Sequence, residues 1–436
     1  MYKSSNIHKD ILLGIILLAA SLWDFRQYDI RVFDIIALCS CLMLFLVSYK
    51  DISFKTFDKN RLFMVSILIL WSLYGFWSYN HYSSFVMIGG VFLLFALFQQ
   101  QEIFSRLHIL VPIVLFVHLI VFWIQYFSFY LFDYYVDYFT YFEGAARNFS
   151  MPGGMKHFRP SGLFQEPNSF SLCIFMLTSL CLIQKNKYIP FLIILAGFSM
   201  MVSQSLWGSI ASIMLFLCYI LLTNKINTKY LTRMVLALSG VILLFVGLLF
   251  LQNSNLNQTP QFLKRIDTVF SSGSFRERFI TNTLSENDKM KWSAYAERDW
   301  SQHKNKVKWE QYIKKYTDRI IREEENKKYT DALMSNVIIG HGFSTKPFVY
   351  GLALNGFSFF WNSLGLLGIS LVLLSSILFT RRASVQIFPE LACYFVIFIM
   401  LLLSYPIVTY SFFWFWMFSI IVQIRSKQTC TTAKSV

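Results

Sequence analysis

Charged residues are scarce in this sequence, and their scarcity decides the class of protein. Only 14% of the 436 residues are Asp, Glu, Lys or Arg, whereas 56% are apolar. Long apolar runs recur along the whole chain, and hydrocarbon holds no water to satisfy backbone amides, so each run is expected to be a helix. A barrel would show short alternating segments instead. The sequence therefore predicts an all-α polytopic membrane protein.

Cysteine is absent from the two predicted outer loops, 128–167 and 253–355, where a disulfide could form. The seven cysteines fall in apolar runs or in the C-terminal tail, at Cys39, Cys41, Cys173, Cys181, Cys218, Cys393 and Cys430. Disulfides are therefore not expected, and Cys39 with Cys41 lacks partners for a metal site. A signal-peptide cleavage site is missing as well, because no small-residue motif follows the first apolar run. We expect that run to stay in the protein.

Hydropathy predicts about twelve transmembrane helices. They lie near residues 11–25, 32–49, 62–79, 82–98, 107–127, 168–184, 188–202, 206–223, 234–252, 356–379, 388–404 and 408–424. The first, seventh and eighth runs are short enough to be re-entrant or interfacial instead. Lys and Arg follow the second, sixth, eighth, tenth and last runs, for example at Lys50, Lys185, Lys225, Arg381 and Arg425. Because short loops rich in these residues resist translocation, both termini are predicted to be cytoplasmic.

This topology divides the chain into membrane and loop segments. Five helices in 1–127 precede an outer loop at 128–167, and four more helices occupy 168–252. A large, partly helical outer loop at 253–355 then separates the ninth and tenth spans. Three helices fill 356–424, and residues 425–436 form a cytoplasmic tail. The net charge of +15 then reflects topology and a basic outer region, so nucleic-acid binding is not expected. The Tyr and Phe residues of the first outer loop suit either an interfacial belt or a sugar-stacking surface.

The run from Arg159 to Asn168 carries the main functional signal. It reads Arg-Pro-Ser-Gly-Leu-Phe-Gln-Glu-Pro-Asn, and Glu166-Pro167 is typical of the start of a helix. The free amides of that helix start favour an anion, and Arg159 could add a bidentate clamp for phosphate once Gly162 lets the chain fold back. Glu166 is either a stabilising cap or a base that accepts a sugar hydroxyl proton.

Two later segments complete a family pattern. Gly340-His341-Gly342 ends the large loop, and Asn355 to Gly368 leads back into the membrane. With the Arg159 run and Ser274 to Arg278, these segments resemble the O-antigen polymerase and ligase superfamily, membrane glycosyltransferases that act on polyprenyl-diphosphate-linked glycans. The resemblance covers about Arg159 to Val372, and the order of the motifs and their shared outer placement carry it.

The resemblance implies a reaction and roles for individual residues. Outer-loop arginines would hold the lipid diphosphate while an acceptor glycan attacks the donor sugar, with no nucleotide sugar, cofactor or essential metal. Arg159 and one of Arg276 or Arg278 take the diphosphate role by resemblance, and Asn168 and Asn355 become glycan-binding candidates. Glu166 and His341 are the candidate general bases, with His157 behind them.

One departure separates two members of the superfamily. Ligases usually carry a histidine just before the asparagine of the last motif, and here that position is Leu354. This favours a polymerase of undecaprenyl-diphosphate-linked repeat units, acting on the outer face of a bacterial inner membrane with a chain-length regulator as a candidate partner. An O-antigen ligase that uses a lipid A-core acceptor remains the alternative.

A lipid-linked glycan flippase is the main rival from another class. Twelve spans with both ends inside also suit a carrier, but carriers tend to place their long connection inside and to line their pathway with buried charges. Here the long loop is predicted outside, and Asp24, Asp34 and Glu390 are nearly all the acidic residues that the spans offer. A membrane scaffold is the third reading, and it predicts no dependence on any single outer arginine.

Overall fold

The structure is a computed structural model of the chain. It describes residues 4–27, 30–48, 66, 69–71, 73–74, 77, 101–139, 141–142, 158–183, 188–223, 338–340, 364–371, 388–402, 412–413, 415–417 and 419–420. The predicted spans near 82–98 and 234–252 lie outside these residues, as does most of the large loop at 253–355.

The described chain is mostly helical, as predicted. The helices are α1 (Ser4–Ser21), α2 (Val32–Ser48), α5 (Gln101–Phe132), α6 (Pro167–Ile183), α7 (Ile189–Val202), α8 (Leu206–Thr223) and α16 (Phe388–Leu402). Two-residue strands β1 (Arg26–Gln27) and β2 (Ile30–Arg31) pair antiparallel between α1 and α2. All these helices coincide with predicted apolar runs, because a run that must satisfy its own backbone amides has few alternatives to a helix.

Both ends of α1 and of α5 differ from the sequence prediction. The two helices begin at Ser4 and Gln101, before the runs expected from residues 11 and 107. The first run was expected to reach residue 25, but α1 ends at Ser21, and the residues after it turn toward β1. The fifth run was expected to end at 127, but α5 continues to Phe132, where Asp133 adopts a left-handed φ of 47° and ends it. The loop that was predicted to begin at residue 128 therefore begins after Phe132, since aromatic residues extend the helix beyond the apolar core that hydropathy detects.

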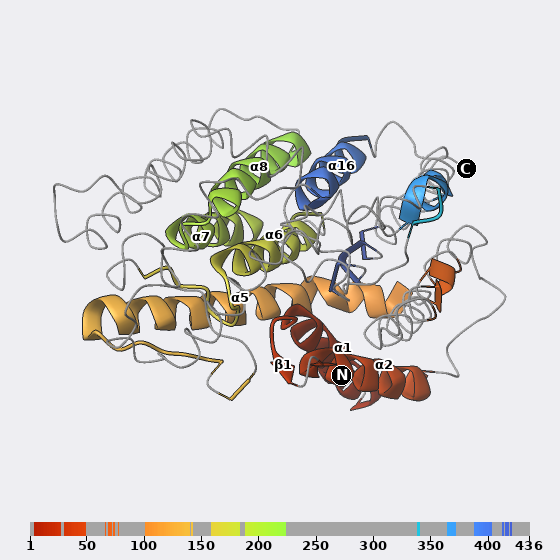
Figure 1. Ribbon diagram of the computed structural model, residues 1–436, viewed down its shortest axis with the longest axis horizontal. Coiled ribbons are helices and arrows are strands. Elements are labelled where there is room, and N and C mark those ends of the chain that lie inside the picture. The colour runs from red at the N-terminus through yellow and green to blue at the C-terminus, as the bar shows by residue number, and fades with distance from the viewer. Residues whose placement is uncertain are drawn as a thin grey trace, which may run out of the picture.

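The long helix α5 organises the packing. In Figure 1 it runs through the middle of the molecule, with α1 and α2 on one side and α6, α7 and α8 on the other. It contacts α1, α6 and α7, and α16 packs against α8. Close approach of α6 to α8 depends on Gly208, where an added Cβ would overlap the Ser171 hydroxyl. The core between these helices is aliphatic and aromatic, with Trp23, Phe122, Phe170 and Trp416 fully buried.

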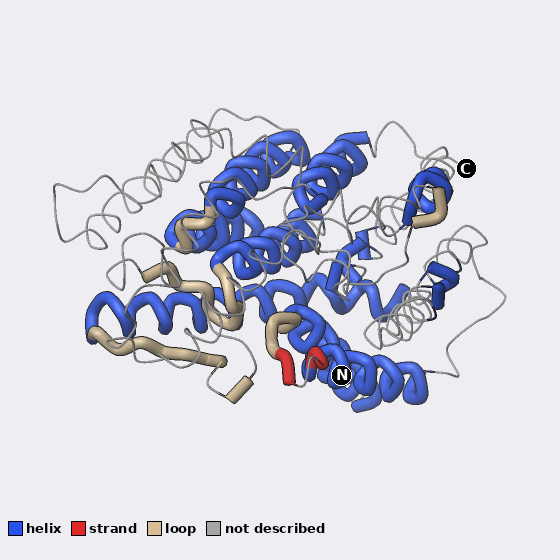
Figure 2. The backbone as a smooth tube through the Cα atoms, in the orientation of Figure 1, coloured by secondary structure: helices blue, strands red, loops and turns tan. Residues whose placement is uncertain are grey.

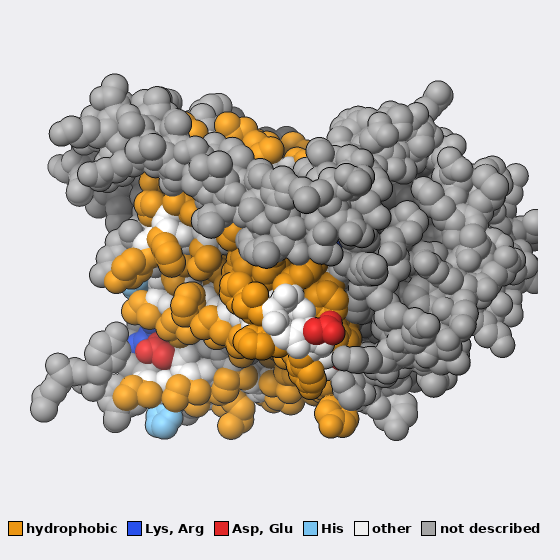
Figure 3. Space-filling model, turned by 90° about the vertical axis from the view of Figure 1, so that its left-hand side faces the viewer, with side chains coloured by type: hydrophobic (Ala, Val, Ile, Leu, Met, Phe, Trp, Pro, Cys, Tyr) orange, Lys and Arg blue, Asp and Glu red, His pale blue; other side chains and the backbone are white. Residues whose placement is uncertain are grey.

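The outward face of α5 is also apolar. Its exposed large side chains recur every three or four residues, at Ile109, Ile113, Phe116, Ile120, Ile124, Phe127 and Leu131. Figure 3 views the molecule from the end where α5 finishes, and hydrophobic side chains cover most of the described surface. Contiguous apolar surface of this kind marks a protein or membrane contact.

The length of α5 sets it apart from its neighbours. Among the described residues, Arg106–Phe132 is the one helix long and apolar enough to cross a membrane. Shorter apolar helices accompany it within the same residues, at Val32–Val47, Pro167–Leu182, Ile189–Val202 and Trp207–Ile220. The expected twelve spans therefore stay a prediction.

Candidate functional site

The Arg159 run forms a turn that is fastened to α5 by one side chain. Oε1 of Gln125 accepts hydrogen bonds from the backbone N–H groups of Ser161 and Gly162, each at 2.9 Å. The amide of Gln125 also donates from Nε2 to the carbonyl of Val136 at 3.0 Å, and the side chain is 1% exposed. A buried amide thus ties both the turn and the loop at 133–142 to α5. Figure 2 shows the described loops in tan beside the helices.

The turn needs a glycine at its centre. Gly162 has a φ of +56°, and a Cβ there would lie 3.4 Å from backbone atoms of Phe122. The prediction that this glycine lets the chain fold back is confirmed. Ser161 closes the turn, since its carbonyl accepts the N–H of Phe164 at 3.2 Å and its hydroxyl donates to the Phe164 carbonyl at 2.5 Å.

Arg159 is carried on the edge of this turn. The preceding residue, Phe158, is fully buried with its ring 4.3 Å from that of Phe129, and its carbonyl accepts the Tyr130 hydroxyl at 2.6 Å. The Arg159 side chain is itself half-buried. Bonds on both flanks therefore fix the backbone of Arg159 beside the C-terminal end of α5.

The start of α6 follows directly and agrees with the prediction from Glu166-Pro167. The helix begins at Pro167, and the Glu166 carbonyl accepts the N–H of Phe170 at 3.1 Å. The chain's own carboxylate lies beside this helix start, because Oδ2 of Asp24 accepts the N–H of Gln165 at 3.1 Å. A nearby negative charge weakens the attraction of the helix terminus for a second anion. Within the described segment 158–168, Arg159 is the one Lys or Arg.

Asn168 and the turn between α7 and α8 meet on the same side. The Ser205 hydroxyl donates to Oδ1 of Asn168 at 2.6 Å and accepts the N–H of Gly208 at 3.0 Å. Asn168 is exposed, and Glu166 is half-buried. Since its carbonyl oxygen is engaged by Ser205, the amide of Asn168 presents its NH₂ group as the donor for a ligand.

A second polar contact lies beneath the turn. The Ser21 hydroxyl and Nε2 of His118 are 2.7 Å apart, and the His118 ring stacks on Phe164 at 5.4 Å. Both polar side chains are at most 1% exposed. Phe164 of the turn therefore rests on a histidine that α1 holds in place.

The aromatic loop after α5 is largely packed. The Phe139 ring stacks 4.5 Å from that of Phe25, which joins this loop to the chain after α1. Burial raises the pKa of Tyr135, and the neighbouring Asp137 carboxylate raises it further. Tyr134 and Tyr141 are 63% and 89% exposed. Exposed tyrosines agree both with an interfacial belt and with a sugar-stacking surface, the two expectations for this loop.

Two of the segments on which the sequence resemblance rests meet elsewhere in the structure. Gly340 and Gly365 both have a positive φ, of 74° and 62°, and a Cβ on Gly365 would overlap the Gly340 backbone. Nε1 of Trp71 donates to the carbonyls of Ile339 and Leu364, at 2.8 Å and 3.1 Å. In Figure 1 the blue segment at 364–371 is drawn at the side of the molecule where α5 begins, and the yellow segment at 158–166 is drawn toward the other side.

The remaining candidates cannot be placed. His157, Arg276, Arg278, His341 and Asn355 lie outside the described residues. Of the predicted site residues, the structure brings Arg159, Glu166 and Asn168 to one end of the helix bundle. Gln125, Tyr130, Ser205 and His118 support them and were not predicted. Within the described chain, no cluster of three His, Cys, Asp or Glu residues is arranged to hold a metal ion.

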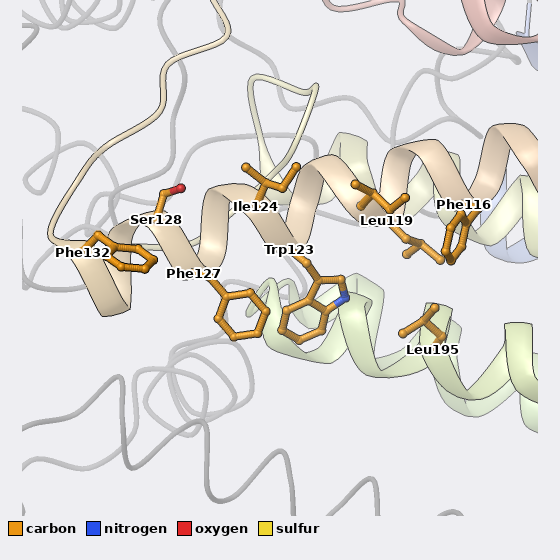
Figure 4. Close-up of a pocket in the computed structure, with 9 residues that line it drawn as sticks. Phe116, Leu119, Trp123, Ile124, Phe127, Ser128, Phe132 and Leu195 are labelled. Carbon is orange, nitrogen blue, oxygen red and sulfur yellow. The ribbon is translucent and has the colours of Figure 1, made fainter.

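An apolar groove lies on another face of α5. Its volume is about 400 Å³, and Figure 4 shows Trp123 and Phe127 beside α7, with Leu195 on that helix. Nε1 of Trp123 donates to the Ser199 hydroxyl at 3.0 Å. Two steps along a helix place Trp123 and Gln125 roughly 160° apart, so the groove and the Arg159 turn face nearly opposite directions.

No protein-family model, curated protein or solved structure matches this chain. Function is therefore inferred from the residues and their geometry.

Proposed function

We propose that the protein is a bacterial inner-membrane glycosyltransferase that polymerises oligosaccharide repeat units on the outer face of the membrane. Donor and acceptor are both linked to undecaprenyl diphosphate, and the product is an O-antigen or a related surface polysaccharide. The chain crosses the membrane about twelve times with both termini in the cytoplasm. The sequence motifs suggest this class, and the geometry around Arg159 supports it.

The observation that carries the proposal is the firm placement of Arg159. Its turn is held by Gln125 and Tyr130 from one helix, so the guanidinium starts from a fixed backbone position. A planar guanidinium forms bidentate hydrogen bonds with phosphate oxygens, and these need a defined approach. A loop arginine that only contacts lipid headgroups does not need a fixed backbone position.

The directions of the helices support a position for this residue at the end of the bundle opposite the start of α1, which is the outer end when the N-terminus is cytoplasmic, as proposed. The end of α1 and the start of α6 meet through Asp24 and Gln165, and the starts of α6 and α8 meet through Asn168 and Ser205. At the opposite end, Arg106 near the start of α5 pairs with Asp10 of α1. Helices that cross a membrane alternately arrange their ends in this way, with α1 and α5 leading outward and α6 and α8 leading inward.

The proposed reaction transfers the growing glycan to the end sugar of an incoming unit. A hydroxyl oxygen of the acceptor bonds to the anomeric carbon of the donor, the bond from that carbon to the diphosphate breaks, and undecaprenyl diphosphate leaves with the bonding electrons. Arg159 stabilises the charge on the diphosphate. Glu166 takes the proton from the hydroxyl, and Asn168 donates a hydrogen bond to the glycan.

Elongation in a purified system tests this proposal. Lipid-linked single repeats are extracted from source cells that lack the gene, so the correct substrate accumulates. Added to the purified protein in lipid nanodiscs, they should become a ladder of longer glycans, with free undecaprenyl diphosphate as the second product. If the single repeats persist unchanged with folded, monodisperse protein, the proposal is wrong.

A further inference from the structure

Gln125 is an unusual residue for its place in the chain. It lies inside the helix that is apolar enough to cross a membrane, and its side chain is 1% exposed. Burying an amide costs free energy unless its hydrogen bonds are made. Gln125 makes three bonds, two accepted by Oε1 and one donated by Nε2, and all three go to backbone groups outside the helix.

The two accepted bonds act directly on the turn that carries Arg159. The N–H groups of Ser161 and Gly162 are consecutive, and one oxygen binds both. Pro160 between Arg159 and Ser161 has a restricted φ, so a constraint at Ser161 is transmitted to Arg159. Tyr130 holds the other flank through the Phe158 carbonyl. The backbone on both sides of Arg159 is therefore held in place.

We infer that Gln125 is a positioning residue for Arg159, an inference that rests on the proposed role of Arg159 in holding the lipid diphosphate. A bidentate clamp loses much of its effect when it is displaced by about 1 Å. Without the Gln125 acceptor, two backbone N–H groups would be buried without a partner, and the turn would move to satisfy them. Arg159 would move with it.

Two variants at one position separate positioning from general stability. Gln125→Met keeps the size of the side chain and removes all three hydrogen bonds. Gln125→Glu keeps an oxygen acceptor for the two N–H groups and, in its protonated form, an O–H donor for Val136. Trp123→Phe is the matched control, because it deletes the bond to Ser199 from the same helix on the face turned away from Arg159.

Binding of undecaprenyl diphosphate to each protein in nanodiscs is the readout, with thermal unfolding measured in parallel. We expect Gln125→Met to weaken binding about tenfold, which corresponds to the loss of about 1.4 kcal/mol. Gln125→Glu should restore binding to within about threefold of wild type, and Trp123→Phe should leave it unchanged even if both Met and Phe variants lower the unfolding temperature equally.

The outcomes for Gln125 and for Arg159 are distinct. If Arg159→Lys weakens diphosphate binding but Gln125→Met binds like Trp123→Phe, Gln125 has no positioning role and the proposed function stands. If Arg159→Lys binds as wild type does, the proposed diphosphate role is wrong, and the inference about Gln125 is wrong with it. If Gln125→Met does not fold, Gln125→Asn decides, because the shorter amide does not reach both N–H groups and its wild-type binding would contradict the inference.

Discussion

The Ser205 hydroxyl donates a hydrogen bond of 2.6 Å to Oδ1 of Asn168 and so joins the starts of two helices. Ser205 precedes α8 and accepts the N–H of Gly208, which makes it the N-cap of that helix. Asn168 lies in the first turn of α6. One hydroxyl therefore stabilises α8 and sets the direction of an exposed amide at the candidate site.

Ser205→Ala should affect both roles. Loss of the cap should destabilise the protein by about 1 kcal/mol, and the freed Asn168 amide should lower the rate of glycan elongation about threefold. Ser209→Ala is the matched control, since the Ser209 hydroxyl donates to the Ser205 carbonyl within the helix. Thermal unfolding and elongation assays check both effects. Equal elongation by the two variants would show that Asn168 does not depend on Ser205.

Gly162→Ala should be costly for a different reason. The φ of +56° is unfavourable for alanine by about 1–2 kcal/mol. Gly14→Ala in α1 makes the same chemical change in a helix, where a Cβ would lie 3.8 Å from Leu110, an ordinary contact. We expect Gly14→Ala to be neutral or stabilising by up to about 1 kcal/mol. Denaturant unfolding of the two variants distinguishes them, and a loss of similar size in both would contradict the described turn.

Much of the helical framework could be predicted from the sequence, but the contacts between distant segments could not. An apolar run must satisfy its backbone amides locally, so the start of α6 at Pro167 follows from a proline beside Glu166. Gln125 was missed because hydropathy averages over a run and does not show which face a polar residue occupies. Its bonds to residues 36 and 37 positions away depend on how the turn packs. The Gly340–Gly365 contact likewise joins distant segments.

Alkaline pH should destabilise the loop that follows α5. Burial and Asp137 raise the pKa of Tyr135 in the folded protein. The neutral phenol is therefore favoured by folding, and its contribution is present below the unfolded pKa of about 10 and lost as pH rises above it. Tyr135→Phe should flatten the fall in unfolding temperature between about pH 9 and 11. Tyr134→Phe, at an exposed neighbour, should follow wild type, and identical slopes for all three proteins would rule out this role for Tyr135.

The predicted sidedness can be tested with introduced cysteines. Asn168 is exposed at the proposed outer end, and Ile7 is 51% exposed at the proposed inner end of α1. In intact spheroplasts, a membrane-impermeant maleimide should label Asn168→Cys and should label Ile7→Cys only after permeabilisation. A cysteine-free background removes the native thiols from the measurement. Labelling of Ile7→Cys alone in intact cells would invert the topology and remove Arg159 from the outer face.

Substitution of Arg159 by Lys is the most direct test of the central claim. Lysine keeps the positive charge but loses the planar fork that binds two phosphate oxygens together. Arg31→Lys is the matched control, because Arg31 pairs with Asp34 at 3.6 Å near the start of α2. In nanodiscs with undecaprenyl diphosphate, Arg159→Lys should raise the Kd about tenfold and shorten the glycan product, whereas Arg31→Lys should match wild type. Wild-type affinity and product length in Arg159→Lys would contradict the account.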